Sequence, residues 1–307
     1  MTETTAQKSS ALIWIQAVRA FSFTASIIPC ILGAMLALLF SNGAVLWYLL
    51  PFIIISALFL HAGTNLVSDY FDYLKGVDTK DSMGSSGVLV AGLLKPKQIF
   101  NAGIFFFFLA LLVGLPVIFA RGEIIIYLGL IGILGGFFYT GWPIGYKYLA
   151  LGDFFVFALM GPLMVIGTFY ALTGTFHPTV LYTSLPIGFL VTGILQANNL
   201  RDIAHDRKAN VKTLAGVMGS GFAKAEYLFL IAGAYLIVIA LVIFKILEPW
   251  SLLVLLSLPP AIKNLTLIKG IGTEDTAKIA MLDVMTAQLH LLFGLLLSIS
   301  LVLSKFL

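Results

Sequence analysis

Long apolar runs alternate with shorter polar segments along the whole chain. A helix needs about 20 predominantly apolar residues to cross the hydrocarbon core of a bilayer, and nine runs are candidates for such crossings. They are too long and unbroken for the strands of a membrane barrel. The pattern predicts an all-α integral membrane protein. Its nine transmembrane helices are expected at residues 12–40, 44–68, 99–119, 123–142, 153–173, 179–200, 225–245, 249–268 and 281–304.

Composition supports a membrane protein and excludes a separate soluble domain. Of the 307 residues, 60% are hydrophobic and 10% are charged, whereas a soluble domain carries roughly 25% charged residues. We therefore expect a single transmembrane domain over residues 1–307. The first run is too long for a signal peptide and has no small-residue cleavage site after it, so we expect it to remain as a helix. Cys30 is alone, which excludes an internal disulfide and a cysteine-ligated metal cluster.

The distribution of lysine and arginine predicts the orientation in the membrane. With the N-terminus in the cytoplasm, 15 of the 18 basic residues lie at inside ends and loops. The outside then holds Arg121, Lys245 and Lys305. The positive-inside rule places the N-terminus inside and, with nine crossings, the C-terminus outside. This bias largely explains the basic character of the chain, so we expect no nucleic-acid partner, and no feature of the sequence indicates an oligomeric state.

Two aspartate-rich stretches follow apolar runs and interrupt this pattern. The stretch NLVSDYFDYLKGVDTKD occupies residues 65–81, after the second run, and NNLRDIAHDRKANVK occupies residues 198–212, after the sixth. Even-numbered helices end on the same side, so both stretches should face the cytoplasm. The loops that carry them, at about 65–98 and 198–222, are the longest inside loops. Because binding residues concentrate in such loops, we expect them to cap a site over a central cavity.

The spacing within each stretch places its acids on one helical face. Asn65, Asp69 and Asp72 stand at i, i+4 and i+7, and the second stretch repeats the arrangement at i, i+4 and i+8 with Asn198, Asp202 and Asp206. Like charges at this spacing repel, and the cost grows beside a membrane, so a cation should compensate them. Ligand sets made of oxygen suit Mg²⁺, which commonly binds through one or two carboxylates together with substrate phosphates.

Basic residues beside the acids complement a phosphorylated ligand. They are Lys75, Lys147, Arg201, Arg207, Lys208 and Lys212. Acids and bases together predict a magnesium–diphosphate site at the membrane surface. The alternative is a solvated acidic loop whose lysines serve only to set the topology.

The two motifs resemble those of the UbiA superfamily of intramembrane prenyltransferases. That family carries N-D-x-x-D-x-x-x-D and D-x-x-x-D at the cytoplasmic ends of helices 2 and 6 of a nine-helix bundle. Here SDYFDYLKGVD supplies Asp69 and Asp72 in register, and the second motif matches fully. Ser68 replaces the usual asparagine, and Gly76 stands where the last aspartate is expected. Asn65, one turn earlier, and Asp78, two residues later, are the candidate substitutes.

Within the superfamily, three segments look most like the prenyltransferases that act on 1,4-dihydroxy-2-naphthoate in menaquinone synthesis. They are DYFDYLKGVDT, FYTGWPIGYKYLALGD and NNLRDIAHDRKANVKTLA. The resemblance implies transfer of a polyprenyl group from its diphosphate to an aromatic acceptor. Two Mg²⁺ ions would bridge the diphosphate to ligands from both motifs. Those ligands are Asp69, Asp72, Asp202 and Asp206, with Asn65 and Asn198 beside them.

Other residues receive substrate-binding roles by the same resemblance. Lys147 matches a lysine expected to contact the diphosphate, and Arg207 and Lys212 are further candidates. Tyr139 either turns its ring toward a developing allylic cation or belongs to the interfacial aromatic belt. Asp153 either orients the acceptor hydroxyl or caps a helix.

Other polar residues lie within or beside the predicted helices. Arg19, at the inside end of the first run, either extends its charged end to the interface or binds the acceptor carboxylate or the diphosphate. His61 and His290 are interpreted as packing residues. The sequence GSSG at 84–87 lacks the P-loop context, and a hinge in the cap is its alternative role.

Several other functions fit the sequence less well. A transporter would place acids near the middle of the bilayer, whereas these acids cluster at one interface. A CDP-alcohol phosphotransferase would carry D-G-x-x-A-R, which is absent. Within the superfamily, the competing acceptors are 4-hydroxybenzoate, homogentisate, a chlorophyllide and a glycerophosphate lipid. If the chain is bacterial, we expect it in the cell inner membrane with its site facing the cytoplasm.

Overall fold

The computed structural model describes residues 9–79, 82, 84–271 and 276–307, so Lys8, Lys80 and Asp81 lie outside the described residues. The described residues form helices and connecting loops, and none of them forms a β-strand. Eight helices within them are long and apolar enough to cross a membrane, which confirms an all-α, multi-pass membrane protein. They are α2 with η1 (Ala20–Phe40), α3 with η2 (Trp47–Leu74), α4 (Pro96–Arg121), α6 to α7 (Gly152–Thr173), α8 (Pro178–Lys208), α10 (Ser220–Ile243), α11 with η5 (Pro249–Lys269) and α12 (Leu282–Phe306).

Several of these crossings are composite. Their parts are η1 (Ala20–Phe23), α2 (Thr24–Phe40), η2 (Trp47–Leu49), α3 (Leu50–Leu74), α6 (Gly152–Ala158), η4 (Leu159–Leu163), α7 (Met164–Thr173), η5 (Pro249–Ser257) and α11 (Leu258–Lys269). The shorter elements outside them are α1 (Ser10–Ala17), α5 (Glu123–Phe138), η3 (Tyr146–Tyr148), α9 (Leu214–Met218) and η6 (Thr276–Ile279).

The expected fourth crossing, 123–142, is shorter than predicted. Helix α5 is apolar but has 16 residues, and at 1.5 Å per residue it is about 24 Å long. A bilayer core is about 30 Å thick. Two other helices are longer than predicted, because α3 continues to Leu74 and α8 to Lys208. Both aspartate stretches therefore begin on helices.

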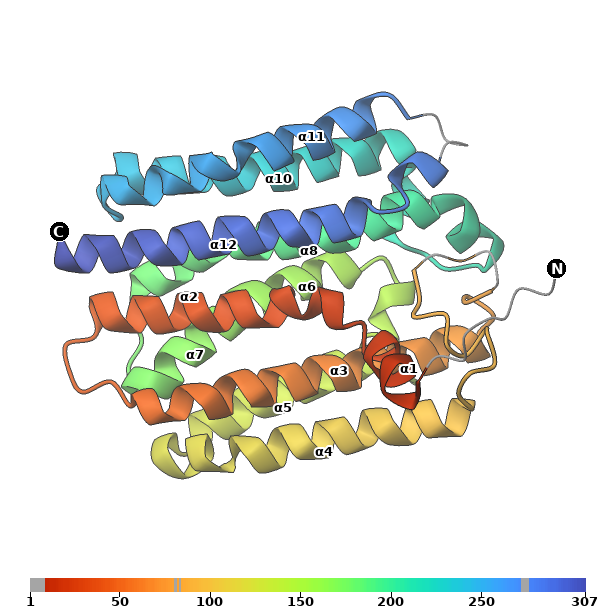
Figure 1. Ribbon diagram of the computed structural model, residues 1–307, viewed down its shortest axis with the longest axis horizontal. Coiled ribbons are helices and arrows are strands. Elements are labelled where there is room, and N and C mark those ends of the chain that lie inside the picture. The colour runs from red at the N-terminus through yellow and green to blue at the C-terminus, as the bar shows by residue number, and fades with distance from the viewer. Residues whose placement is uncertain (1–8, 80–81, 83, 272–275) are drawn as a thin grey trace.

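The expected first helix, 12–40, is divided in two, and this prediction was wrong. The chain turns at Arg19, whose φ of 53° is left-handed, a conformation that costs a side-chain-bearing residue roughly 1–2 kcal/mol. The turn is supported because the Arg19 guanidinium pairs with Asp69 and the Ser22 hydroxyl donates to the Arg19 carbonyl. As a result α1 lies across one end of the bundle, while the C-terminus lies at the other end (Figure 1).

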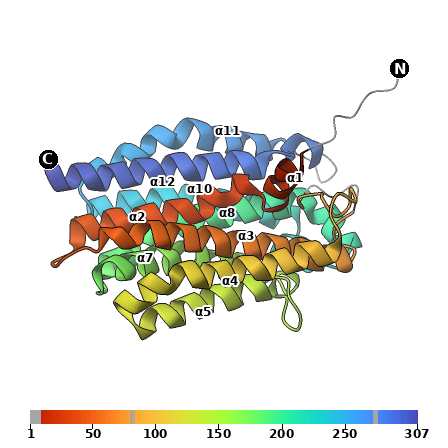
Figure 2. The same cartoon turned by 60° about the horizontal axis from the view of Figure 1, so that its bottom comes forward.

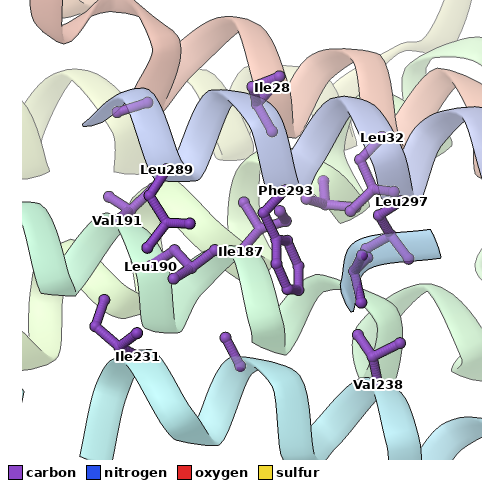
Figure 3. Close-up of a cluster of buried hydrophobic side chains, with 14 of the residues drawn as sticks. Ile28, Leu32, Ile187, Leu190, Val191, Ile231, Val238, Leu289, Phe293 and Leu297 are labelled. Carbon is purple, nitrogen blue, oxygen red and sulfur yellow. The ribbon is translucent and has the colours of Figure 1, made fainter. Parts of the chain in front are cut away.

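The core lies between four long helices with α8 among them. Figure 3 shows apolar side chains from α2, α8, α10 and α12 meeting there, including Ile28, Ile187, Phe293 and Val238. Since lipid is as apolar as these side chains, close packing stabilises such contacts. Glycines allow it: a methyl group at Gly161 would lie 2.4 Å from the Gly188 Cα atom.

Helix α1 and residues 84–94 cover the end of the bundle where α3 and α8 finish (Figures 1 and 2). We call residues 84–94 the covering segment. Ala17, Val88 and Leu89 are buried in one small cluster with Leu66 of α3 and Ile99 of α4. The Gln16 side chain also donates to the Ser86 carbonyl oxygen, at 2.6 Å. Helix α1 and the covering segment are therefore packed together over the aspartate ends of the helices.

Candidate functional site

A cavity of about 380 Å³ lies between α2, α3, α4, α5, the α6 to α7 crossing and α8. At the aspartate end its wall includes Arg19, Lys147 and Asn198, and along α3 it reaches from Ser68 to Ile53. Fifteen residues of α-helix correspond to about 22 Å. Most of the lining is apolar or glycine, so the cavity suits a long hydrocarbon chain with a polar group at one end.

A second, smaller cleft of about 20 Å³ adjoins this polar end and is rich in oxygen atoms. The two spaces share Gly84, Lys147 and Asn198 in their walls. The remaining residues that line the cleft are Val77, Asp78, Ser82, Asn199, Asp202, His205 and Asp206. Asp78, which was the candidate substitute for the last aspartate of the first motif, thus lies opposite the second motif.

The two carboxylates of the first motif are buried and fully engaged by donors. Asp69 is paired with the Arg19 guanidinium and accepts hydrogen bonds from Ser86. Asp72 accepts from Lys147 Nζ and from the Tyr148 hydroxyl, both at 2.7 Å. These donors satisfy the carboxylates in the way that buried charges require.

Charge and burial shift the pKa values of groups around this site. Burial by itself would lower the pKa of Lys147, but Asp72 and the neighbouring acids raise it above its usual value, so the ammonium remains charged. Burial, with the negative charge of Asp72 next, raises the pKa of Asp78 to about 7. A cation in the cleft would favour the ionised form of Asp78.

The second motif is held by Arg201, a buried residue that the sequence grouped with the bases expected to complement a phosphorylated ligand. Arg201 donates to both oxygens of Asp202 at 3.0 Å and to Asp283 at 2.9 Å, and it also contacts the Asn198 side-chain oxygen. Asp206 accepts a longer bond, 3.4 Å, from the Thr213 hydroxyl. Of the two second-motif aspartates, Asp206 is therefore the more weakly bound to protein donors.

The covering segment connects the two motifs. Ser86 binds Asp69, and a methyl group at Gly84 would lie only 2.7 Å from Asp202 Oδ2. The backbone at Gly84 thus approaches the second motif as closely as only glycine allows. The GSSG sequence is therefore part of the wall between the two motifs, and no phosphate-cradling P-loop is needed to explain its glycine.

Besides Arg19, Lys147 and Asn198, two more expected site residues line the cavity, and Asp153 does not. Tyr139 lines it, with the Lys147 ammonium 5.9 Å from its ring centroid, and burial raises its pKa to about 12, so the phenol is neutral. Asn65 also lines it, and its amide nitrogen donates to the Val18 carbonyl at 2.9 Å. Asp153 lines neither space and accepts a bond of 3.4 Å from Asn199.

Arg207 and Lys212 are not brought to the cavity or the cleft. Both are exposed, and Arg207 donates to the Gly216 carbonyl. Arg207 directly follows Asp206 on α8, and adjacent residues of a helix do not share a face. Lys212 lies beyond the end of α8. In this arrangement neither base lines the cavity or the cleft.

Sequence reasoning also missed residues that contact the site directly. These are Tyr148, Ser86, His205 and His61. His61 carried a usable signal, because it continues the series of Asn65 and Asp69 one turn deeper at spacing i, i+4, i+8. It lines the cavity, whereas His290, the other expected packing residue, is fully buried in α12.

The donor chemistry of the cleft fits magnesium. Asp78, Ser82, Asn198, Asp202 and Asp206, whose side chains carry carboxylate, amide and hydroxyl oxygens, line it together with Lys147 and His205. In the described part of the chain, no three acidic, histidine or cysteine side chains form a ready metal centre. Mg²⁺ does not require one, since it usually keeps waters and completes its shell with substrate phosphates. The residues present therefore fit a cation that arrives together with a diphosphate.

Comparisons with known proteins agree with this arrangement. The UbiA prenyltransferase family matches residues 26–281. The 1,4-dihydroxy-2-naphthoate octaprenyltransferase of Bacillus subtilis (strain 168) is 34% identical over 307 residues, covering 99% of this chain and 97% of the relative. The UbiA prenyltransferase domain-containing protein 1 of Gallus gallus is 32% identical, covering 92% and 82% of the two chains.

Solved structures show the same fold at low sequence identity. A UbiA homologue from Archaeoglobus fulgidus bound to GPP and Mg²⁺ has a TM-score of 0.61 and 16% identity, covering 93% of this chain and 99% of that one. The apo UbiA homologue from Aeropyrum pernix K1 has a TM-score of 0.63 and 14% identity, covering 94% and 98%.

Proposed function

Because the chain belongs to the UbiA prenyltransferase family, we propose that it transfers a polyprenyl group from polyprenyl diphosphate to 1,4-dihydroxy-2-naphthoate, a step of menaquinone biosynthesis. The observation that carries this proposal is the near full-length match to an octaprenyltransferase named for that acceptor. The junction of an oily cavity with an acid-lined cleft supports it.

The cleft is proposed to bind the diphosphate and the cavity its hydrocarbon tail. Asp69, Asp72, Asp202 and Asp206, with Asn198 beside them, would hold two Mg²⁺ ions. Asn65 lines the cavity and not the cleft, so its side-chain oxygen is left for the acceptor. When bound, these ions would neutralise the diphosphate and stabilise it as the leaving group. Lys147 lies in the walls of both spaces and would bind the diphosphate at the bond that breaks.

The chain's own residues would then protect and direct the reactive end of the tail. Loss of diphosphate leaves an allylic cation, which the neutral ring of Tyr139 can stabilise through its π face. The covering segment and α1 would exclude bulk water, which would otherwise consume the cation. An electron-rich ring carbon of the acceptor attacks the cation and forms the new carbon–carbon bond.

Arg19 is the proposed contact for the acceptor carboxylate. Its guanidinium lies at the polar end of the cavity, and its Nε donor is buried without a hydrogen-bond partner among the described residues. A carboxylate on the acceptor would supply that partner. Attack at the ring carbon that bears the carboxylate forms the carbon–carbon bond, and carbon dioxide then leaves from the same carbon as the aromatic ring is restored.

The proposal includes the topology. We place the N-terminus and both motifs on the cytoplasmic side of a cell membrane, the inner membrane if the organism is a bacterium, because of the strong excess of basic residues at that end. The whole chain, 1–307, would act as one transmembrane domain in which nine crossings surround the cavity and the loops at 65–98 and 198–222 cap it. The polyprenyl tail would enter from the lipid bilayer.

A labelled acceptor tests the proposal. Purified protein in detergent receives Mg²⁺, polyprenyl diphosphate and carboxyl-labelled 1,4-dihydroxy-2-naphthoate, with Asp202→Asn as the inactive control. We expect an unlabelled prenylated product and an equal amount of labelled carbon dioxide. Retention of the label in a prenylated product would contradict the reaction. Consumption of 4-hydroxybenzoate, homogentisate, a chlorophyllide or a glycerophosphate lipid in place of the naphthoate would contradict the acceptor.

A further inference from the structure

A polar cluster lies in the cavity wall one to two helical turns deeper than Asp69. His61 of α3 contacts Ser22 of η1 through Nε2, at 3.1 Å, and Ser26 of α2 through Nδ1, at 2.8 Å. Asn65, one turn closer to the acids, donates to the Ser22 hydroxyl at 3.3 Å. All four side chains line the cavity, and His61 is only 8% exposed.

The hydrogen bonds around Ser22 determine which nitrogen of His61 carries the proton. The Ser22 hydroxyl donates its single hydrogen to the Arg19 carbonyl, at 2.9 Å. Its oxygen can then only accept, from Asn65 Nδ2 and from His61 Nε2. The neutral imidazole therefore has its hydrogen on Nε2. Its Nδ1 accepts, so the Ser26 hydroxyl is the donor of the second bond.

Among Ser22, Ser26, His61 and Asn65, only hydrogen-bond acceptors remain free for a ligand. The Ser26 hydroxyl donates its one hydrogen to His61, so its oxygen can still accept a hydrogen bond through its lone pairs. Asn65 has spent its amide hydrogens on Val18 and Ser22, and among the described residues no donor reaches its side-chain oxygen. A ligand that satisfies both positions must bring two hydroxyl hydrogens.

The helical spacing sets the scale of the site. Asn65 and His61 stand four residues apart on α3, about 6 Å along the helix, and the Ser26 hydroxyl is held 2.8 Å from His61 Nδ1. Two hydroxyls at para positions of a six-membered ring span a distance similar to this helical spacing. The quinone form of the ring carries two carbonyl oxygens, which only accept hydrogen bonds. They would face the lone pairs of Ser26 and Asn65 without a hydrogen between them, so the quinone should bind more weakly than the diol.

We propose that Ser26 and Asn65 bind the two ring hydroxyls of the aromatic acceptor, and that His61 is the positioning residue that fixes Ser26 as a hydrogen-bond acceptor. The site then takes the reduced 1,4-diol and discriminates against the quinone. This inference rests on the proposed function and deepens it, because the diol is the electron-rich form that can attack an allylic cation.

Binding of two small rings without turnover tests the inference. Under anaerobic conditions, 1,4-naphthalenediol and 1,4-naphthoquinone are titrated into purified protein that lacks polyprenyl diphosphate. We expect the diol to bind about tenfold more tightly, the factor that one unsatisfied hydrogen bond typically contributes. In His61→Leu the preference should fall to about onefold.

Steady-state kinetics provide the second readout. His61→Leu should raise the KM for the acceptor about tenfold and leave the KM for polyprenyl diphosphate within about twofold. His61→Gln should restore the preference, because its amide oxygen can accept from Ser26 while its nitrogen donates to Ser22. His290→Leu, which removes an equally buried imidazole from α12, is the matched control and should change neither quantity.

The outcomes separate this inference from the proposed function. Equal affinity for diol and quinone in the unsubstituted protein would overturn the inference, and so would an unchanged preference in His61→Leu. Transfer to the labelled naphthoate is measured independently and can fail while the diol preference persists. Such a result would overturn the acceptor assignment and leave this hydroxyl site standing.

Discussion

Replacing Lys147 should affect metal binding and turnover in opposite directions. The Lys147 ammonium is 2.7 Å from Asp72 Oδ2, and both side chains are largely buried. With an effective dielectric constant of 20, two unit charges at this separation attract by about 6 kcal/mol, a sum that desolvation partly offsets. In the absence of diphosphate, Lys147 therefore competes with any divalent cation for Asp72.

Lys147→Met removes the charge and keeps the length of the side chain. We expect Mn²⁺, used as a spectroscopic substitute for Mg²⁺, to bind the substrate-free variant about tenfold more tightly, since one charge-assisted hydrogen bond contributes roughly 1.5–3 kcal/mol. Turnover should instead fall about 100-fold, because a donor to the departing diphosphate contributes about 3 kcal/mol to the transition state. Electron paramagnetic resonance titration and a product assay on the same preparation measure the two effects.

Lys305→Met, at the opposite end of the bundle, is the control and should leave both quantities unchanged. The reasoning is refuted if Lys147→Met binds Mn²⁺ no more tightly than the unsubstituted protein. It is also refuted if turnover stays within about twofold, since Lys147 would then serve only the membrane topology.

The remaining predictions concern the acids, the covering segment and the exposed base. Asp202→Asn and Asp206→Asn should each abolish turnover with the helical circular dichroism unchanged, and a chelator should inactivate the unsubstituted protein until Mg²⁺ is restored; activity in the chelator would contradict the cation model. Gly84→Ala should lower turnover at least about tenfold, because its methyl group would meet Asp202 Oδ2 at 2.7 Å, whereas Gly270→Ala has open space and should behave normally in the same product assay. Arg207→Ala should change the KM for polyprenyl diphosphate by less than about twofold, since the side chain is exposed and bonded to Gly216; a tenfold rise would show that Arg207 moves to the diphosphate.

Apolar run length predicted most of the helices because it reports the solvent that each segment prefers. It could not predict the turn at Arg19, since that turn depends on a contact with Asp69, 50 residues away. Run length also ended α8 at residue 200, although the helix continues to Lys208. Polar residues there are stabilised by the protein around them, which a count of apolar residues does not register.

Helical spacing predicted the faces of the two motifs but not the partners that the fold brings to them. Tyr148 and Ser86 reach the acids from loops whose course no periodic pattern describes. Arg207 carries the expected charge in the expected segment. Because it directly follows Asp206 on α8, its side chain lies on a different face of the helix and bonds to Gly216. His61 was predictable in principle, because the spacing that selected Asn65 and Asp69 extends one turn further to reach it.

The packing of α1 against the covering segment links the two groups that hold Asp69. One oxygen of Asp69 is bound by Arg19, at the end of α1, and the other by Ser86 of the covering segment. Because Ala17 and Val88 belong to one buried cluster, a displacement of this unit would release both oxygens together. Such a displacement would raise the affinity of Asp69 for a cation by some factor. By thermodynamic linkage, the bound cation would favour the displaced arrangement by the same factor.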